Sequence, residues 1–452
     1  MSSSINAEMY HRGPASDYNR WSTLLSDPSW SYSSLLPLFR KSEHFQTLPS
    51  SASSDYITPA EHISPEYHGF DGEWKISYRS YFHKISGYFI KAAEKVGIPF
   101  NYDFNGKSTL GCGRIQTFVD AQECMRSNTE KAFLSLDVKA RDNLHVLTSA
   151  KCLRLTIEEG KCTGAVILHR GQEIHIKAKR QVIVSCGAFD SPRILKASGV
   201  TLPGIGKNLQ DHLGINISFK VPSAADKNLT TADQWNGFIN KFVTLYKYFV
   251  YRTGPAASNL GEAVAFYRTR LSHVLVDDRA SGDDSPHVEL IAVPALVQHH
   301  EGQQSLVRIR PDFDWSRFEF RGRYVTIVPL LLNPYSAGEV RYGDNGEIEI
   351  DPRYFTDKRD IDVLVEGVRV VRRIVREGYA ALGLDGMEEV VPGEHLQSDA
   401  QIESFIRSNA ETYYHPVGTC KVVPFAWSCS PWIRVDCRWE EREMRWRWWI
   451  PV

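Results

Sequence analysis

The segment from residue 143 to residue 185 constrains the fold more than any other part of the chain. Short apolar runs alternate there with turn residues, at Glu159-Gly160 and again at Gly171. This alternation predicts a meander of strands. The last run, 181–185 (QVIVS), is apolar at its centre and is typical of a strand buried in a parallel sheet. We therefore expect a mixed α/β fold in which the meander returns to a central sheet.

Three stretches carry the apolar spacing of amphipathic helices, namely 81–96, 191–197 and 360–376. The second has Pro192 at a position tolerated in a first helical turn and Gly199 where a helix ends. The third repeats its apolar residues most regularly, so we expect a long helix packed on a sheet.

Other segments predict strands and buried aromatic residues. Residues 324–332 form an apolar run, and 339–341 with 347–350 predict a hairpin around an Asp-Asn-Gly turn. The stretch 230–275 is rich in aromatic residues. Such a stripe usually belongs to the core, and the alternative is that it lines a substrate site.

Length and charge exclude several classes of protein. A chain of 452 residues with 42% hydrophobic residues is long enough for two interleaved domains. Its 53 Lys and Arg balance 54 Asp and Glu, which favours a small ligand over nucleic acid or a membrane as partner. The eight cysteines form no CxxC pair, so we expect no metal. No secretory signal is visible, which makes the cytoplasm the default location.

The composition changes after Pro424. Six of the eleven tryptophans lie in the last 26 residues, mixed with Arg and Glu in no helical or strand period. A basic aromatic tail can bind membranes or nucleic acid. We favour a second explanation, in which 424–452 comes from a shifted reading frame or a retained intron.

Several motifs then occur in one order, and together they resemble the glucose-methanol-choline (GMC) oxidoreductase family. The resemblance covers roughly residues 2–423. The segments that carry it are SSSINAEMYHRG (2–13), HGFDG (68–72), RDNL (141–144), CGAFDSP (186–192), LPGIGKNLQDH (202–212), NPYS (333–336) and YHPVGTC (414–420).

The resemblance implies an enzyme that uses FAD to oxidise an alcohol, with oxygen or another acceptor taking the electrons. It implies an incomplete Rossmann-like FAD-binding domain interleaved with an antiparallel-sheet substrate domain. By the same comparison, 1–60, 112–220 and 377–423 belong to the FAD-binding domain. The substrate-binding domain is expected to comprise 61–111 and 221–376.

Site residues follow from the same resemblance. His415 matches the active-site histidine of the family, and an imidazole suits a base that takes the hydroxyl proton near neutral pH. Without that context, a histidine before a proline is more often an ordinary loop residue.

Five further residues match positions at which the family binds FAD: Ser3, Asn6, Ala7, Cys152 and Gly187. Each has an ordinary structural explanation as well. The opening serine and asparagine can belong to a loop or a helix cap, Cys152 can be an ordinary strand residue, and Gly187 can simply be a glycine that a turn requires.

One expected motif is missing. No G-x-G-x-x-G loop occurs in the sequence, although such a loop holds the pyrophosphate of a dinucleotide at a helix N-terminus. The family's closing segment, with its second active-site His or Asn, is also not recognisable after Val423. We therefore expect weakened FAD binding and impaired activity. The alternatives are a non-catalytic fragment or erroneous gene product that binds no flavin, and a nicotinamide-dependent dehydrogenase, which the missing loop disfavours.

Overall fold

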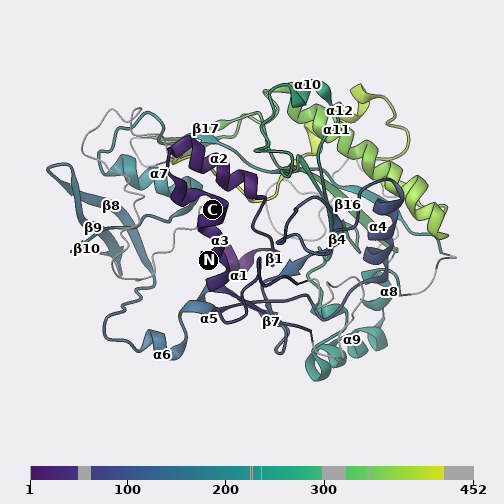
Figure 1. The fold of residues 1–452 in the computed structure, drawn as a ribbon, viewed down its shortest axis with the longest axis horizontal. Coiled ribbons are helices and arrows are strands. Elements are labelled where there is room, and N and C mark those ends of the chain that lie inside the picture. Colours follow the sequence, from purple (N-terminus) through teal and green to yellow (C-terminus); the bar gives the residue numbers. More distant parts are fainter. Residues whose placement is uncertain are drawn as a thin grey trace.

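An antiparallel sheet of eight strands organises the larger half of the molecule (Figure 1). The structure is a computed structural model that describes residues 2–48, 63–223, 225, 228–235, 237–297, 322–343 and 347–421. Six of its strands follow one another from edge to edge in the order β19 (Glu388–Val391), β13 (Ile217–Lys220), β16 (Tyr324–Leu331), β15 (Val288–Val293), β14 (Ala263–Tyr267) and β4 (Gly111–Arg114). The other two are β12 (Leu213–Gly214), which pairs with β16, and β20 (Glu411–Thr412), which pairs with β12. The strand predicted at 324–332 is confirmed.

Two helices cover one face of this sheet. They are α4 (Lys84–Lys95) and α11 (Lys358–Arg373), and α11 continues into a π-helical turn, Ile374–Tyr379. Both match the predicted amphipathic helices. Asp357 is the N-cap of α11, and its side chain accepts a hydrogen bond from the backbone N–H of Arg359.

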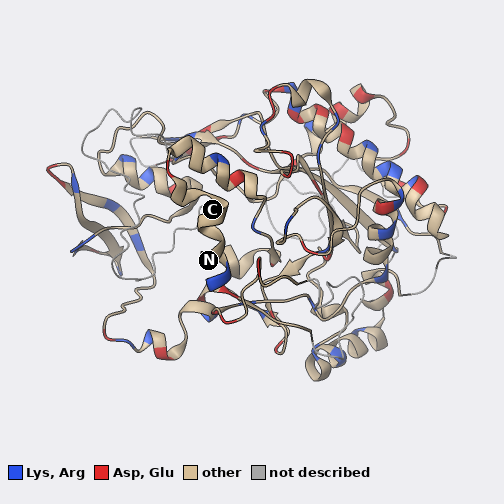
Figure 2. Ribbon diagram, in the orientation of Figure 1, with Lys and Arg blue, Asp and Glu red and all other residues tan. Residues whose placement is uncertain are grey.

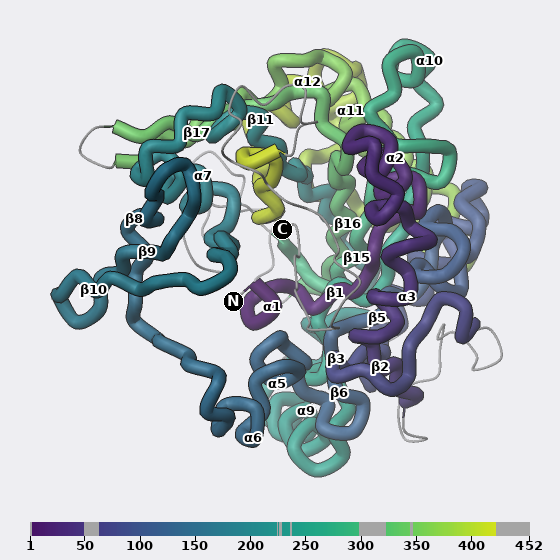
Figure 3. Tube along the Cα trace, turned by 60° about the vertical axis from the view of Figure 1, so that its left-hand side comes forward, coloured from purple at the N-terminus to yellow at the C-terminus, as the bar shows by residue number. Residues whose placement is uncertain are grey.

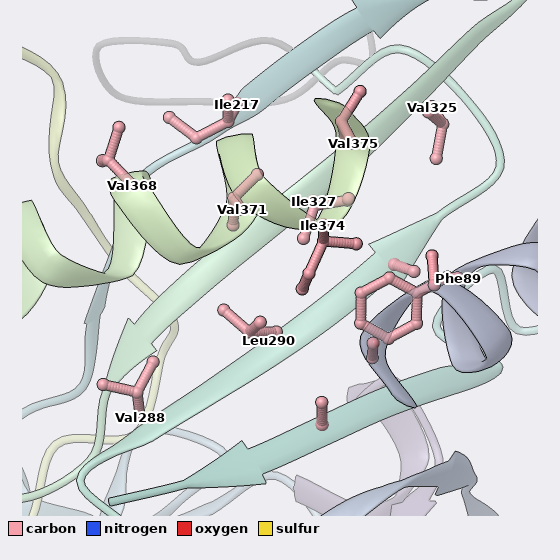
Figure 4. Close-up of a cluster of buried hydrophobic side chains, with 14 of the residues drawn as sticks. Phe89, Ile217, Val288, Leu290, Val325, Ile327, Val368, Val371, Ile374 and Val375 are labelled. Carbon is pink, nitrogen blue, oxygen red and sulfur yellow. The ribbon is translucent and has the colours of Figure 1, made fainter. Parts of the chain in front are cut away.

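The interface between these helices and the sheet is the main hydrophobic core. Figure 4 shows side chains of α11 and the π-helical turn directed at the strands, with Phe89 of α4 beside them. The fully buried side chains include Phe89, Ile217, Val288, Leu290, Ile327, Val368, Val371 and Ile374. Burial of such side chains contributes roughly 1.5–3 kcal/mol each.

The opposite face of the sheet holds a second, smaller cluster. Alternate residues of a strand point to opposite faces, so Ile291 points away from α11 while its neighbour Leu290 belongs to the main core. Ile291 packs near Val264 and Phe266, together with Met9 from the start of the chain. The N-terminal segment therefore crosses the face of the sheet that α11 leaves uncovered.

The smaller half contains the predicted meander. β8 (Ala150–Glu158), β9 (Lys161–His169) and β10 (Gln172–Lys177) form an antiparallel three-stranded sheet, as expected. The prediction of a buried parallel strand at 181–185 is wrong, because this segment forms no strand and Ile183 is 50% exposed. Among the described residues no neighbouring strand pairs with it. Leu147, in the apolar run before the meander, is similarly 51% exposed.

Two further expectations need correction. α7 (Gly187–Ala197) begins four residues earlier than predicted, with Pro192 inside the helix and no side-chain cap. α9 (Phe238–Tyr251), in the aromatic stretch, does not belong to the core, since only Thr244 in it is buried. The predicted hairpin is confirmed as β17 (Gly338–Tyr342) and β18 (Ile348–Asp351), which extend β11 (Lys207–Leu209).

The remaining elements are short or peripheral. They are the helices α1 (Ser2–Ile5), α2 (Ala15–Leu25), α3 (Tyr32–Ser42), α5 (Thr129–Phe133), α6 (Leu136–Lys139), α8 (Thr231–Trp235), α10 (Ser272–Leu275) and α12 (Asp399–Asn409), and the strand pairs β1 (Met9–Tyr10) with β5 (Gln116–Thr117), β2 (Glu43–Phe45) with β3 (Trp74–Ile76), and β6 (Val119–Asp120) with β7 (Met125–Arg126). Within the described ranges no helix is long and apolar enough to cross a bilayer. The tail 424–452 lies outside them.

Buried charges tie the start of the chain to the rest of the fold. The guanidinium of Arg12 pairs with the carboxylate of Glu43, whose other oxygen lies 2.7 Å from Nδ1 of His68. Nε2 of His68 lies 2.8 Å from a carboxylate oxygen of Asp103. These four side chains come from distant segments and are almost fully buried, so the cluster fixes the path of residues 9–13 across the sheet.

Candidate active site

Two antiparallel segments bring His212 and His415 together. Gln210 and Val417 exchange backbone hydrogen bonds of 3.0 and 2.8 Å, and the N–H of Tyr413 donates to the carbonyl of His212 at 3.0 Å. β12 and β20 pair at the same place. The pairing of 208–214 with 411–418, which are about two hundred residues apart in sequence, therefore creates the site (Figure 3).

The two imidazoles contact each other directly. Their Nδ1 atoms lie 3.1 Å apart, and the rings are nearly perpendicular with centroids 5.2 Å apart. In this contact one Nδ1 donates a proton and the other accepts it. A third imidazole, His11, packs edge-on against Phe266 at 5.5 Å between centroids and interacts electrostatically with His415.

All three histidines are neutral at neutral pH. His11 and His415 are exposed and His212 is half-buried, yet desolvation by the surrounding protein lowers the pKa of His11 to about 4 and the pKa of His212 to about 3. Protonation of His415 would lower both pKa values further. Burial also lowers the pKa of His415, opposed by the carboxylate of Asp211. In the described part of the chain no cluster of three or more His, Cys, Asp or Glu side chains is placed to hold a metal ion. The group is suited to proton transfer.

Backbone geometry holds the loop that carries His415. The carboxylate of Asp211 accepts the backbone N–H of His415 at 3.1 Å and the hydroxyl of Tyr354 at 2.8 Å. Tyr414 adopts a left-handed conformation with φ 63°, which is uncommon for a bulky residue and found where the surroundings over-determine the backbone. Gly418, at φ 92°, passes so close to Asn208 that a Cβ would lie 2.2 Å from its carbonyl oxygen. The loop is therefore rigidly positioned.

The residues expected to bind FAD fall into two groups. Ser3, Asn6 and Ala7 form the first. The Ser3 hydroxyl accepts the N–H of Thr129 at 3.1 Å, Asn6 Oδ1 accepts from the guanidinium of Arg126 at 2.6 Å, and the carbonyl of Ala7 accepts from Asn259 at 2.9 Å. Asn6 and Ala7 remain exposed. The segment is thus anchored at several points and leads directly to His11.

Cys152 and Gly187 form the second group, at the junction of β8 and α7. The guanidinium of Arg193 in α7 donates to the carbonyl of Cys152 at 3.2 Å. Gly187 has φ 80°, and no atom lies within 4 Å of the position a Cβ would take. The neighbouring carbonyl of Ala188 accepts the hydroxyl of Thr419 at 2.6 Å, which links this group to the His415 loop. No hydrogen bond between described residues joins it to Ser3, Asn6 or Ala7.

Sequence reasoning missed two residues of the site, His11 and His212, and a buried acid, Glu289, which lies opposite Phe266 on the neighbouring strand. His11 and His212 lie inside motifs that were recognised as family segments, but nothing local indicated that they meet His415. Glu289 is a single acidic residue in an apolar strand, which is a signal that could have been used. It is 5% exposed, and its Oε1 has no hydrogen-bond partner among the described residues. Burial raises the pKa of Glu289 to about 8.

Comparison with curated proteins shows relatives across nearly the whole chain. An alcohol dehydrogenase [acceptor] of Pseudomonas putida is 30% identical, covering 93% of this chain and 71% of the relative. An oxygen-dependent choline dehydrogenase of Paraburkholderia xenovorans is also 30% identical, covering 93% of this chain and 70% of the relative.

Solved structures share the fold. An FAD-dependent oxidoreductase from Chaetomium thermophilum superposes with a TM-score of 0.75 at 21% identity, covering 92% of this chain and 75% of that one. A fungal aryl-alcohol oxidase gives a TM-score of 0.75 at 18% identity, covering 92% and 76%. Family models described as GMC oxidoreductase match residues 2–214 and 334–424. The chain therefore belongs to the GMC oxidoreductases, a family of FAD-dependent enzymes that act on alcohols.

Proposed function

We propose that His415 is the base that takes the hydroxyl proton of a primary alcohol during its oxidation to the aldehyde. The observation that carries this proposal is the 3.1 Å contact between the Nδ1 atoms of His415 and His212. FAD, when bound, supplies the acceptor for the hydride that leaves the carbinol carbon. The alcohol thus loses one proton to the protein and one hydride to the cofactor.

The pair of histidines divides the work in a definite way. If His415 donates its Nδ1 proton to Nδ1 of His212, Nε2 of His415 is left unprotonated and can accept the substrate proton. His212, with its pKa near 3, stays neutral and goes on accepting the hydrogen bond from the imidazolium that forms. We infer that His212 positions and stabilises His415 and does not itself take the proton.

FAD fits beside the residues of the second group. The open space in front of Gly187 and the start of the eleven-residue helix α7 suit a cofactor that approaches a backbone closely, since helix N-termini attract anionic groups. The hydrogen bond from Thr419 to Ala188 connects that position with the His415 loop. Ser3, Asn6 and Ala7 would meet another part of the cofactor.

We also propose that this chain holds FAD weakly. The supporting observations are the lack of a G-x-G-x-x-G loop in the sequence and the exposed apolar side chains of Leu147 and Ile183, in segments that form no strands. A non-catalytic chain that binds no flavin is the competing proposal. Purified protein titrated with FAD would separate the two, because a bound flavin changes its fluorescence and its visible spectrum.

The test of the base uses protein supplied with excess FAD, an alcohol panel that includes choline and an aryl alcohol, and a redox dye as acceptor. His415→Ala should lose at least a hundredfold in kcat, in keeping with general-base contributions of about 10²–10⁴, while its FAD titration stays unchanged. His273→Ala, which removes an exposed imidazole paired with Asp362, is the matched control. Unchanged turnover in His415→Ala would reject the assignment.

A further inference from the structure

Helix α9 turns its apolar side toward solvent. Phe238 is 85% exposed, Ile239 76%, Phe249 64% and Phe242 63%. These residues and their neighbours repeat at three- and four-residue spacing, so they share one face of the helix. The exposed large apolar side chains of α9 are Phe238, Ile239, Phe242, Val243, Leu245, Tyr246, Phe249, Val250 and Tyr251. This is the reverse of an ordinary surface helix.

Polar residues attach the other side of α9 to the protein. The hydroxyl of Thr244 donates to the carbonyl of Gln234 at 3.1 Å, and the amide of Asn240 donates to the carbonyl of Asp233 at 3.2 Å. At the end of the helix, the carbonyl of Arg252 accepts the hydroxyl of Ser80 at 2.5 Å. Three anchors therefore hold the helix in this orientation.

The charge of α9 has a single sign. Residues 237–252 contain Lys241, Lys247 and Arg252 and no acidic residue, and Figure 2 shows blue but no red on this helix. All three basic side chains are exposed. Asp233 in the adjacent helix α8 is paired with Arg323, so it does not neutralise them. Figures 1 and 3 both place α9 on the rim of the molecule.

We propose that α9 docks the protein on the surface of an anionic lipid membrane. A helix that combines Phe and Leu on one face with flanking Lys and Arg is suited to lie in the interface, its apolar side chains among the upper acyl chains and its cations at the headgroups. Tyrosine also favours this depth. The balanced charge of the whole chain predicts no membrane partner, but the charge on α9 is locally positive.

A second copy of the chain is a poorer occupant. In a symmetric dimer each patch meets itself, so Lys241 and Lys247 of two molecules would crowd together without an acidic partner. Large exposed apolar patches require some cover, and anionic lipid provides it while compensating the positive charge.

The test is co-sedimentation of the full chain with vesicles of phosphatidylcholine containing phosphatidylglycerol, and with vesicles of phosphatidylcholine alone. We expect binding to the anionic vesicles, at least tenfold weaker in the triple variant Phe238→Ser, Phe242→Ser, Phe249→Ser. Lys241→Gln should weaken binding about fivefold, the effect of about 1 kcal/mol per basic residue near an anionic surface. Ile348→Ser with Ile350→Ser, at positions 40% and 46% exposed on β18, is the control and should bind normally.

Single substitution of Phe249 by Trp adds a second readout, because its fluorescence should shift to shorter wavelength on the anionic vesicles. Equal sedimentation with neutral vesicles, or undiminished binding of the triple variant, would overturn the proposal. It would also be overturned by a wild-type dimer that the triple variant converts to a monomer while neither binds vesicles.

Discussion

The hydroxyl of Thr419 donates a 2.6 Å hydrogen bond to the carbonyl of Ala188. Ala188 lies four residues before Pro192 in α7, and proline has no N–H to offer to that carbonyl. Thr419 therefore satisfies an acceptor that the helix itself leaves open. The same loop carries His415, so the irregularity in α7 fixes the position of the proposed base.

Thr419→Val should remove this bond with little change in volume. We expect a loss of about 1 kcal/mol in the free energy of unfolding, measured by urea denaturation, and a lower kcat because the loop is less well held. Thr356→Val, which removes an exposed hydroxyl bonded to Arg353, should change neither quantity appreciably. Equal effects of the two substitutions would contradict the role of Thr419.

Gly418→Ala should displace the same loop. The positive φ and the approach to Asn208 leave no room for a methyl group, so we expect a cost of about 1–3 kcal/mol and a marked fall in kcat. Gly204→Ala is the matched control, since Gly204 has no atom within 4 Å of a Cβ and no positive φ. Thermal melts and turnover of both variants provide the measurement.

The pH dependence of kcat/KM should follow His415. Because burial lowers its pKa below 6.5, the imidazole is neutral and able to accept a proton throughout the neutral range, and activity should fall only as the pH drops below 6.5. His212→Ala should reduce kcat about a hundredfold, whereas His212→Asn, which keeps an acceptor near Nδ1, should retain more activity. A profile with its acid limb above pH 7 would argue against His415 as the base.

Glu289→Gln should stabilise the protein at alkaline pH. The carboxyl has a pKa of about 8 in the folded chain against 4.5 when free, so the folded state binds the extra proton and stability declines as the pH rises from 4.5 to 8. The amide avoids this loss. We expect the variant to exceed the wild type by on the order of 4 kcal/mol at pH 8 and to match it near pH 4.5, in urea titrations at the two pH values.

His68 should give the protein a second alkaline weakness. The carboxylates of Asp103 and Glu43 outweigh the effect of burial and raise the pKa of His68 to about 9. The protonated imidazole stabilises the folded state fully below pH 6.5, which is the pKa of histidine in the unfolded chain. This stabilisation, about 3 kcal/mol, is lost as the pH rises to 9. His68→Gln should be less stable at pH 6 and should lack this part of the decline. An unchanged decline in the variant would assign it to other groups.

Local patterns in the sequence predicted the elements whose packing they determine. The apolar spacing of 360–376 predicted α11, and the meander of β8, β9 and β10 followed from its turns. The prediction of a strand at 181–185 was wrong because a strand needs a partner strand, and no local pattern reveals whether one is present. The prediction that the aromatic residues of α9 belong to the core was wrong because an apolar face was assumed to point inward. Hydrogen bonds of Thr244 and Asn240 turn that face outward.

The candidate site was predictable only in part, for the same reason. His415 could be found from its motif, but its contact with His212 depends on the pairing of β12 with β20, which are far apart in the chain. The shifts in pKa of His11 and Glu289 depend on what surrounds them in three dimensions. The contacts between these residues leave no signal at a single position of the sequence; only Glu289 stands out locally, as an isolated acid in an apolar run.

The four buried side chains Arg12, Glu43, His68 and Asp103 carry two positive and two negative charges when His68 is protonated. The net charge of the cluster is then zero. Replacing any one of the four by a neutral residue leaves a buried charge without a partner, which lowers the free energy of unfolding by about 3–5 kcal/mol. Homologous chains should therefore vary at these positions in concert, and a neutral residue at position 43 should be accompanied by the loss of the cation at position 12. Because several substitutions would have to occur together, we expect these four positions to diverge slowly among members of the family.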